Sequence, residues 1–184
     1  LTDGNVRAAS LTNAMEVTSS EASSVMSFVR SGMGDAEQWK LFDVGHSAPV
    51  YVGKALYQLG EGQTQEDEYA AYSANNYADF RTATLDRPET VYIGTNGGGL
   101  HAFDVETGLE RWMWIAPNQL ANLKKQRKVE DDDSITYDHH YFIDNGVFIQ
   151  DIHDGSSWKT VMVIGQGKGT GSSKGQLNQA NYYS

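Results

Sequence analysis

The sequence predicts an all-β fold interrupted by short helices. Val91 to Trp114 contains three runs of β-branched and aromatic residues separated by turns rich in Gly, Asn and Asp, which predicts three antiparallel strands in 24 residues. A further turn pair, Asn145-Gly146, lies between two apolar runs, the pattern that most strongly predicts a short hairpin. Short strands at this pace are typical of sandwiches, barrels and propellers.

Composition excludes several classes of protein. A chain of 184 residues can bury one real core, but its net charge of −10 argues against nucleic acid and anionic lipid, which are bound by clustered Lys and Arg. The absence of cysteine removes disulfides and thiolate metal sites. No apolar stretch approaches the length of a membrane-spanning helix, so we expect no membrane insertion.

Residues 1–38 are expected to form a helical lead-in to a β domain that occupies residues 39–184. Thr18 and Glu21 have the spacing of a capping box, and an apolar face follows as far as Arg30. The residues of that face are Ala22, Val25, Met26 and Val29. Packing on its own domain is the expected role of the face, with binding to a partner as the alternative.

The stretch from Trp39 to Gly53 has a strand pattern and carries three residue types of a hydrolase triad. These are Asp43, His46 and Ser47. Because no G-x-S-x-G nucleophile elbow occurs in the chain, we expect His46 to be held by backbone hydrogen bonds rather than to act in catalysis.

A polar and acidic insertion loop is expected at about residues 57–87. It carries four tyrosines and is long for a connection between strands. Loops of this length are often functional, so the insertion is a candidate contact surface, with a plain solvated loop as the alternative.

The second half of the chain continues the β pattern. Pro117-Asn118 predicts an N-cap and a short helix from Leu120. Two strands, His140–Asp144 and Val147–Ile149, are expected on either side of the Asn-Gly pair, and Trp158–Ile164 is expected to form another.

Charged and glycine-rich runs each suggest a binding site for an ion, but the residues around each run argue against that site. The basic run Lys124 to Lys128 precedes acidic residues, which is typical of a solvated helix end and a charged loop, with a polyanion contact as the alternative. The run Gly165 to Gly171 has glycines spaced as in a phosphate loop, but no helical pattern follows it, so we expect a turn between strands. Asp131, Asp133 and Asp138 could supply oxygen ligands to calcium, with a plain acidic loop as the alternative because they lack the EF-hand spacing.

Two levels of family resemblance are visible in these motifs. The run Gly98 to Asp104, with Thr107-Gly108 and Trp112, resembles the blade repeat of quinoprotein-like β-propellers, in which the Trp docks on a neighbouring blade. The resemblance implies a partial β-propeller of roughly two blades of antiparallel strands. Because a complete ring needs a longer chain, we expect a fragment with further sequence before Leu1 and after Ser184.

An ordered set of motifs narrows the resemblance. The set comprises FVRSG, WKLFDVGHSAPVYVG, VYIGTNGGGLHAFD, ETGLERW, APNQLANLKK, HHYFIDNG and WKTVMVIGQGKGTG. In this order the motifs resemble the C-terminal propeller domain of the PilC/PilY family, proteins associated with the tip of type IV pili. The likeness runs from about Ser23 to Ser184 and is poor in the insertion at 57–87. The turn at Asn96 departs from the family's Asn-Asp-Gly, which puts in doubt any role for an acid there.

The resemblance implies a protein exported through the periplasm and outer membrane to the cell surface or pilus tip. It implies roles in pilus assembly and surface attachment, with calcium sensing in some full-length members. The implied partners are minor pilins at the pilus tip, the remainder of the same propeller, and a host or abiotic surface. In this fragment we expect no catalytic residue, no cofactor-binding residue, no metal ligand and no nucleic acid partner.

A non-enzymatic role is favoured because no motif assembles a nucleophile, a base and an oxyanion site. One alternative is a pyrroloquinoline-quinone-dependent quinoprotein dehydrogenase, which shares the blade repeat but needs an Asp base and a calcium ion over the quinone. The other alternative is a propeller scaffold of outer-membrane assembly.

Overall fold

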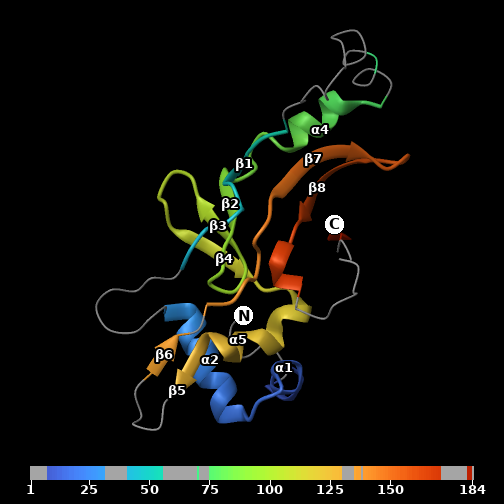
Figure 1. The fold of residues 1–184 in the computed structure, drawn as a ribbon. Helices are drawn as coiled ribbons and strands as arrows, with labels where there is room; N and C mark the ends of the chain where they lie inside the picture. The colour runs from blue at the N-terminus through green and yellow to red at the C-terminus, as the bar shows by residue number, and fades with distance from the viewer. Residues whose placement is uncertain are drawn as a thin grey trace.

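The computed structural model describes residues 8–31, 41–55, 70, 75–129, 135–137, 139–170 and 182–183. Its helices are α1 (Ala8–Met15), α2 (Ser19–Ser31), α4 (Tyr77–Ala83) and α5 (Leu120–Gln126), with 3₁₀ turns η1 (Pro117–Gln119) and η2 (Gly167–Thr170). Its strands are β1 (Val50–Val52), β2 (Thr90–Gly94), β3 (Leu100–Asp104), β4 (Glu110–Trp114), β5 (Arg127–Val129), β6 (Ile135–Tyr137), β7 (Val147–His153), β8 (Trp158–Ile164) and β9 (Tyr182–Tyr183). The chain therefore combines antiparallel sheets with short helices (Figure 1).

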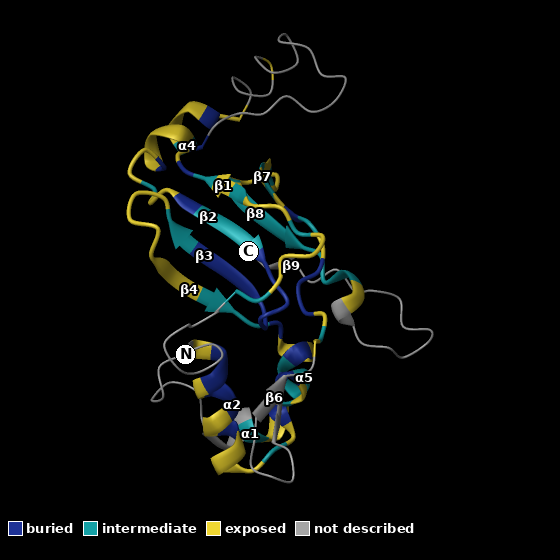
Figure 2. Ribbon diagram, turned by 60° about the vertical axis from the view of Figure 1, so that its left-hand side comes forward, coloured by how far each residue is buried: buried dark blue, intermediate teal, exposed yellow. Residues whose placement is uncertain are grey.

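The first sheet has the order β1-β2-β3-β4 and confirms the three strands predicted between Val91 and Trp114. Of the glycines in the turn between β2 and β3, Gly98 takes a positive φ of 131°, a conformation that residues with a side chain rarely adopt. Cross-strand pairing places Tyr92 opposite Ala102 and Ala102 opposite Trp112. Figure 2 shows the resulting gradient of burial, with β3 mostly buried and the edge strand β4 largely exposed.

The second large sheet has the order β7-β8-β9. Strands β7 and β8 pair along their whole length, from Val147 with Ile164 to His153 with Trp158. The turn between them is held by Asp154, whose Oδ1 accepts the backbone N–H groups of Ser156 and Ser157. The aromatic pair Tyr182-Tyr183 forms β9 and pairs with β8.

The prediction of a hairpin at Asn145-Gly146 is wrong. Only the strand after it exists, and β7 pairs with β8 instead of with His140–Asp144. The backbone before the turn finds its hydrogen bonds elsewhere, because Ile143 N–H donates to Thr95 O and Asp144 N–H donates to Gln166 O. Tertiary hydrogen bonds thus override a strong local turn signal.

The strand predicted from Trp39 to Gly53 is shorter than expected. Within the described part of this stretch only β1 is a strand, and residues 41–49 are irregular. Phe42 has a positive φ of 55°, and the carbonyl of Asp43 accepts the N–H of Asn96, a residue in the turn beyond β2. The residues before β1 therefore leave the sheet and approach that turn.

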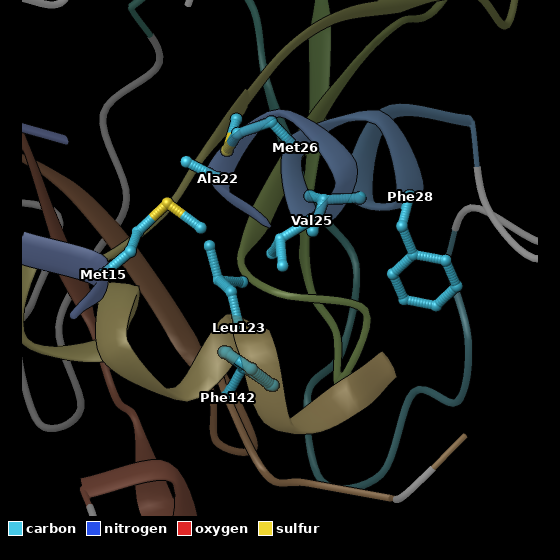
Figure 3. Packing of buried hydrophobic residues seen from close by; sticks show 8 residues of the cluster. Met15, Ala22, Val25, Met26, Phe28, Leu123 and Phe142 are labelled. Carbon is cyan, nitrogen blue, oxygen red and sulfur yellow. The ribbon is translucent and has the colours of Figure 1, made fainter. Parts of the chain in front are cut away.

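The helices form the main apolar core. The predicted capping box is present, since Thr18 N–H donates to Glu21 Oε2 over 2.8 Å and Glu21 N–H approaches Thr18 Oγ1 at 3.4 Å. The predicted apolar face of α2 is buried and packs with α1, α5 and Phe142 (Figure 3). The buried members of this core are Met15, Ala22, Val25, Met26, Phe28, Val29, Leu123 and Phe142.

Helix α4 lies within the region predicted as an insertion loop and packs on the β7–β8 hairpin. Tyr77 is fully buried, its ring meets that of Trp158 at 4.6 Å, and its hydroxyl donates to Asp151 Oδ2 over 2.7 Å. The indole N–H of Trp158 donates in turn to Asn75 O. In the parts of the chain that the structure describes, no helix is long and apolar enough to span a membrane.

Candidate functional site: a polar junction between the sheets

Residues from three separate sequence motifs meet near the end of β2. We call this group the polar junction: Asp43, His46, Asn96, His139 and Asp144. Strand β2 ends at Gly94, where a side chain would place its Cβ 2.3 Å from Ile143 Cγ2. The close approach of the residue 139–146 segment to the sheet therefore requires glycine at that position.

Asn96 is the centre of the polar junction and is only 2% exposed. Its side-chain Nδ2 donates to Asp43 Oδ2 over 2.7 Å, and its Oδ1 accepts the N–H of Phe142 over 3.1 Å. Its backbone carbonyl accepts a hydrogen bond from Gln126 Nε2 at the end of α5. One asparagine thus joins the segment before β1, helix α5 and the segment before β7.

Asp144 provides the second link between segments. Its side chain is 1% exposed, and its carboxylate lies 3.1 Å from His46 Nδ1 and also accepts the backbone N–H of His46. The imidazole of His46 itself is 69% exposed. The expectation that backbone groups hold His46 is wrong, since a buried carboxylate far along the chain holds it.

Asp43 contacts a second histidine at the surface. His139 Nε2 lies 3.0 Å from Asp43 Oδ1, and both side chains are half exposed. Partial burial raises the pKa of Asp43, but hydrogen bonds from Asn96 and His139 outweigh that effect and bring the pKa below its ordinary value. Asp43 is therefore the charged partner in these contacts at neutral pH.

The triad types of the first strand motif do not assemble into a triad. The Asp43 carboxylate contacts Asn96 and His139, whereas Ser47 Oγ accepts the N–H of Gly94 over 3.0 Å. Within the described residues no group of three His, Cys, Asp or Glu side chains is arranged to hold a metal ion. The chemistry of the polar junction is that of a hydrogen-bonded link between sheets.

A second buried polar group lies directly beside the junction. His101 Nδ1 is 2.6 Å from Glu110 Oε1, and its Nε2 is 3.1 Å from Thr95 Oγ1. The geometry resembles a nucleophile, histidine and acid in line, but Thr95 is fully buried and its hydroxyl already accepts the N–H of Gly97. Access for a substrate is therefore absent, and the group stabilises the turn between β2 and β3.

The remaining hypotheses from the sequence concern the acidic run, the basic run, the glycine run and the N-cap at Asn118. Asp131, Asp132, Asp133 and Asp138 lie outside the described residues. Lys124 and Lys125 lie in the last turn of α5, as predicted, and Arg127 begins strand β5, while the acidic part of the expected charged loop lies outside the described residues. Gly167–Thr170 forms a single 3₁₀ turn. Asn118 is not an N-cap, because η1 begins after Ala116 and the Asn118 side chain bonds Gln166.

Sequence reasoning missed the key members of the site. Asn96 was visible only as a turn former and Asp144 only as the end of an expected strand. The signal available for both was their place inside the ordered motifs TNGGGLHAF and HHYFIDNG, which mark the segments that meet here.

Comparisons with known proteins agree with these motifs. No protein-family model matches the chain. The chain is 30% identical over 138 residues to the type IV pilus biogenesis factor PilY1 of Pseudomonas aeruginosa strain UCBPP-PA14, covering 70% of this chain and 10% of that protein. It is 32% identical over 128 residues to a PilY1 homolog of Xylella fastidiosa, covering 69% of this chain and 10% of the homolog.

A solved structure gives a more distant match. The crystal structure of the Pseudomonas aeruginosa PilY1 C-terminal domain aligns with a TM-score of 0.38 and 25% identity, covering 61% of this chain and 19% of that one. The chain spans about a tenth of the length of the curated relatives. The aligned relatives confirm the resemblance that the ordered motifs carry: the chain is homologous to part of the PilY1 type IV pilus biogenesis factors.

Proposed function

We propose that this chain is a structural part of a type IV pilus biogenesis protein at the pilus tip. There it supports pilus assembly and surface attachment through protein contacts. The observation that carries the proposal is the 30% identity to PilY1 over 138 residues, which includes most of this chain. The partners we propose are minor pilins and a host or abiotic surface, and the location is the cell surface after export.

The proposed architecture is roughly two blades of a larger β-propeller. The sheets β1–β4 and β7–β9 correspond to the two blades, residues 1–38 to a helical lead-in, and residues 57–87 to an insertion. Trp112 is 44% exposed on the edge strand β4, which suits a Trp that docks on a further blade. The remainder of the same propeller is therefore a proposed partner of this chain.

The polar junction offers the sharpest test of this role, because it joins the two proposed blades. In cells that produce the full-length protein, Asn96→Ala should reduce the pilin sheared from the cell surface and reduce attachment to a solid surface. The matched control is Asn122→Ala, which removes an amide on α5 whose hydrogen bonds within the described residues go to Gln119 and Lys125, each three positions away.

Immunoblots of the protein in cells and culture medium separate loss of function from loss of protein. Wild-type levels of both piliation and attachment after deletion of residues 41–170 would contradict the proposal. Normal piliation with reduced attachment would assign the segment to adhesion alone.

A further inference from the structure

A cavity of about 560 Å³ lies between the two larger sheets. Strand β7 contacts both β1 and β2 there. The apolar part of its lining comes from Val52 in β1, Tyr92 in β2, Ile149 in β7 and Met162 in β8. Its volume falls within the range of about 300 to 1,000 Å³ that is typical of ligand sites.

The polar lining of the cavity is basic, although the chain is acidic. Arg87, Lys159 and Thr160 contribute to the wall, and among the residues that the structure describes no Asp or Glu does so. The whole sequence carries a net charge of −10, so basic residues in this wall have the opposite sign from the chain as a whole. The Nζ atom of Lys159 pairs with Asp154 in the adjoining turn, which leaves Arg87 as the principal cation.

Arg87 is held in place without an acidic partner in the described part of the chain. Its Nη1 donates to Gly53 O over 3.3 Å, and its guanidinium lies 5.8 Å from the centroid of the Phe80 ring. A guanidinium has five N–H donors in a rigid fork that matches a carboxylate. Arg87 therefore retains the capacity to bind an anion.

A half-buried carboxylate on the same face of the β7–β8 hairpin is engaged elsewhere. Asp151 shares a face of the hairpin with Thr160, but its Oδ1 accepts the hydroxyl of Thr160 and its Oδ2 accepts the hydroxyl of Tyr77. Both oxygens thus receive hydrogen bonds from neutral hydroxyl groups.

The strands beside the cavity favour an extended ligand. Among the described strands, β1 pairs only with β2 and β7 pairs only with β8, so both are edge strands. Edge strands present backbone groups that can pair with an added peptide.

We propose that this cavity binds an extended peptide segment of a partner protein. An acidic side chain of the peptide binds Arg87, and an adjacent apolar side chain packs on Val52, Ile149 and Met162. The site is distinct from the polar junction and does not depend on the role in pilus assembly.

The test is fluorescence anisotropy of the full chain with fluorescein-labelled Val-Leu-Glu-Leu-Val amide. Replacing the peptide Glu by Gln, or Arg87→Gln in the protein, should each weaken Kd by about ten-fold or more, as expected for loss of a charge-assisted hydrogen bond. The control Arg81→Gln removes an exposed cation from nearby α4 and should leave Kd unchanged.

The peptide pair keeps the test valid on the wild-type protein even if Arg87→Gln fails to fold. Equal binding of the Glu and Gln peptides, or no binding of either, would overturn the proposal. Binding of 3-phenylpropanoate, measured by isothermal titration calorimetry, in the absence of any peptide binding would also overturn it, because the ligand would then be a free small carboxylate. None of these results bears on the piliation assay, so the two proposals fail separately.

Discussion

His101 in β3 and Glu110 in β4 are joined by a contact of 2.6 Å between Nδ1 and Oε1. The imidazole is 1% exposed and the carboxylate side chain 26% exposed, so the contact reaches from the buried centre of the sheet to its edge. Thr95 meets the other ring nitrogen, which couples the turn after β2 to the outermost strand of the same sheet. Burial makes each partner costly to remove.

Thr95→Val should therefore lower the free energy of unfolding by about 1 to 3 kcal/mol. The substitution removes a fully buried hydroxyl that accepts the N–H of Gly97 and contacts His101. Urea unfolding followed by circular dichroism measures the change. Thr82→Val is the control, since that exposed hydroxyl bonds only Ala78 O in its own helix. Equal effects of the two substitutions would show that the buried group contributes no special stability.

Asp144→Ala should lower the free energy of unfolding by about 1 to 3 kcal/mol, because it removes the carboxylate that holds His46 by its backbone and its ring. Asp144→Asn keeps the size and one acceptor, so its effect should be smaller. The exposed Asp86→Ala should have little effect. Wild-type stability of Asp144→Ala in urea unfolding would contradict a role of Asp144 in linking the sheets.

Gly94→Ala should destabilise the fold because its Cβ would lie 2.3 Å from Ile143 Cγ2 and 2.8 Å from the Ile143 carbonyl. Overpacking of this kind costs about 1 to 3 kcal/mol. Ile143→Ala removes the closer clash, so the double variant should be less destabilised than the sum of the two single variants. Additive effects in a double-mutant cycle would show that the two residues do not meet in solution.

Acid should weaken the fold through Asp104 and Asp154. The N–H and hydroxyl of Thr107 lower the pKa of Asp104, and the Lys159 ammonium with backbone N–H groups of Ser157 and Ser156 lowers that of Asp154. Both folded-state pKa values lie below the ordinary value of 3.8. The stability that these carboxylates contribute is present above that value and is lost as pH falls below it.

The measurement is the free energy of unfolding in urea at steps from about pH 5 to about pH 2, the range in which such carboxylates protonate. Asp104→Asn combined with Asp154→Asn should flatten the acid limb of the profile. Asp86→Asn, which removes one exposed charge elsewhere, should keep the wild-type slope. An unchanged slope in the double variant would rule out these two carboxylates as the source.

Local patterns in the sequence predicted the elements whose hydrogen bonds are local. The three strands from β2 to β4, the capping box of α2 and the helix near Leu120 all follow from spacing and turn chemistry. Their partners lie within one turn or one hairpin, where periodicity and glycine placement decide the structure.

The polar junction could not be predicted in the same way. Asn96 bonds residues 53 and 46 positions away, and Asp144 bonds a residue 98 positions away. No local sequence pattern predicts such pairings. Long-range backbone hydrogen bonds of Ile143 and Asp144 likewise replace the hairpin that the local pattern predicts at Asn145-Gly146. The ordered motifs identified the participating segments but not their contacts.

This difference in sequence separation has a consequence for the order of folding. Strands β2 to β4 lie within the 25 residues from Thr90 to Trp114, whereas the contact between His46 and Asp144 joins residues 98 positions apart and encloses more than half of the chain. Closing a long loop costs more chain entropy, and folding rates fall as contacts become less local. We therefore expect the β2–β4 meander to form early and the closure of His46 onto Asp144 to limit the rate at which the rest of the chain reaches its native state.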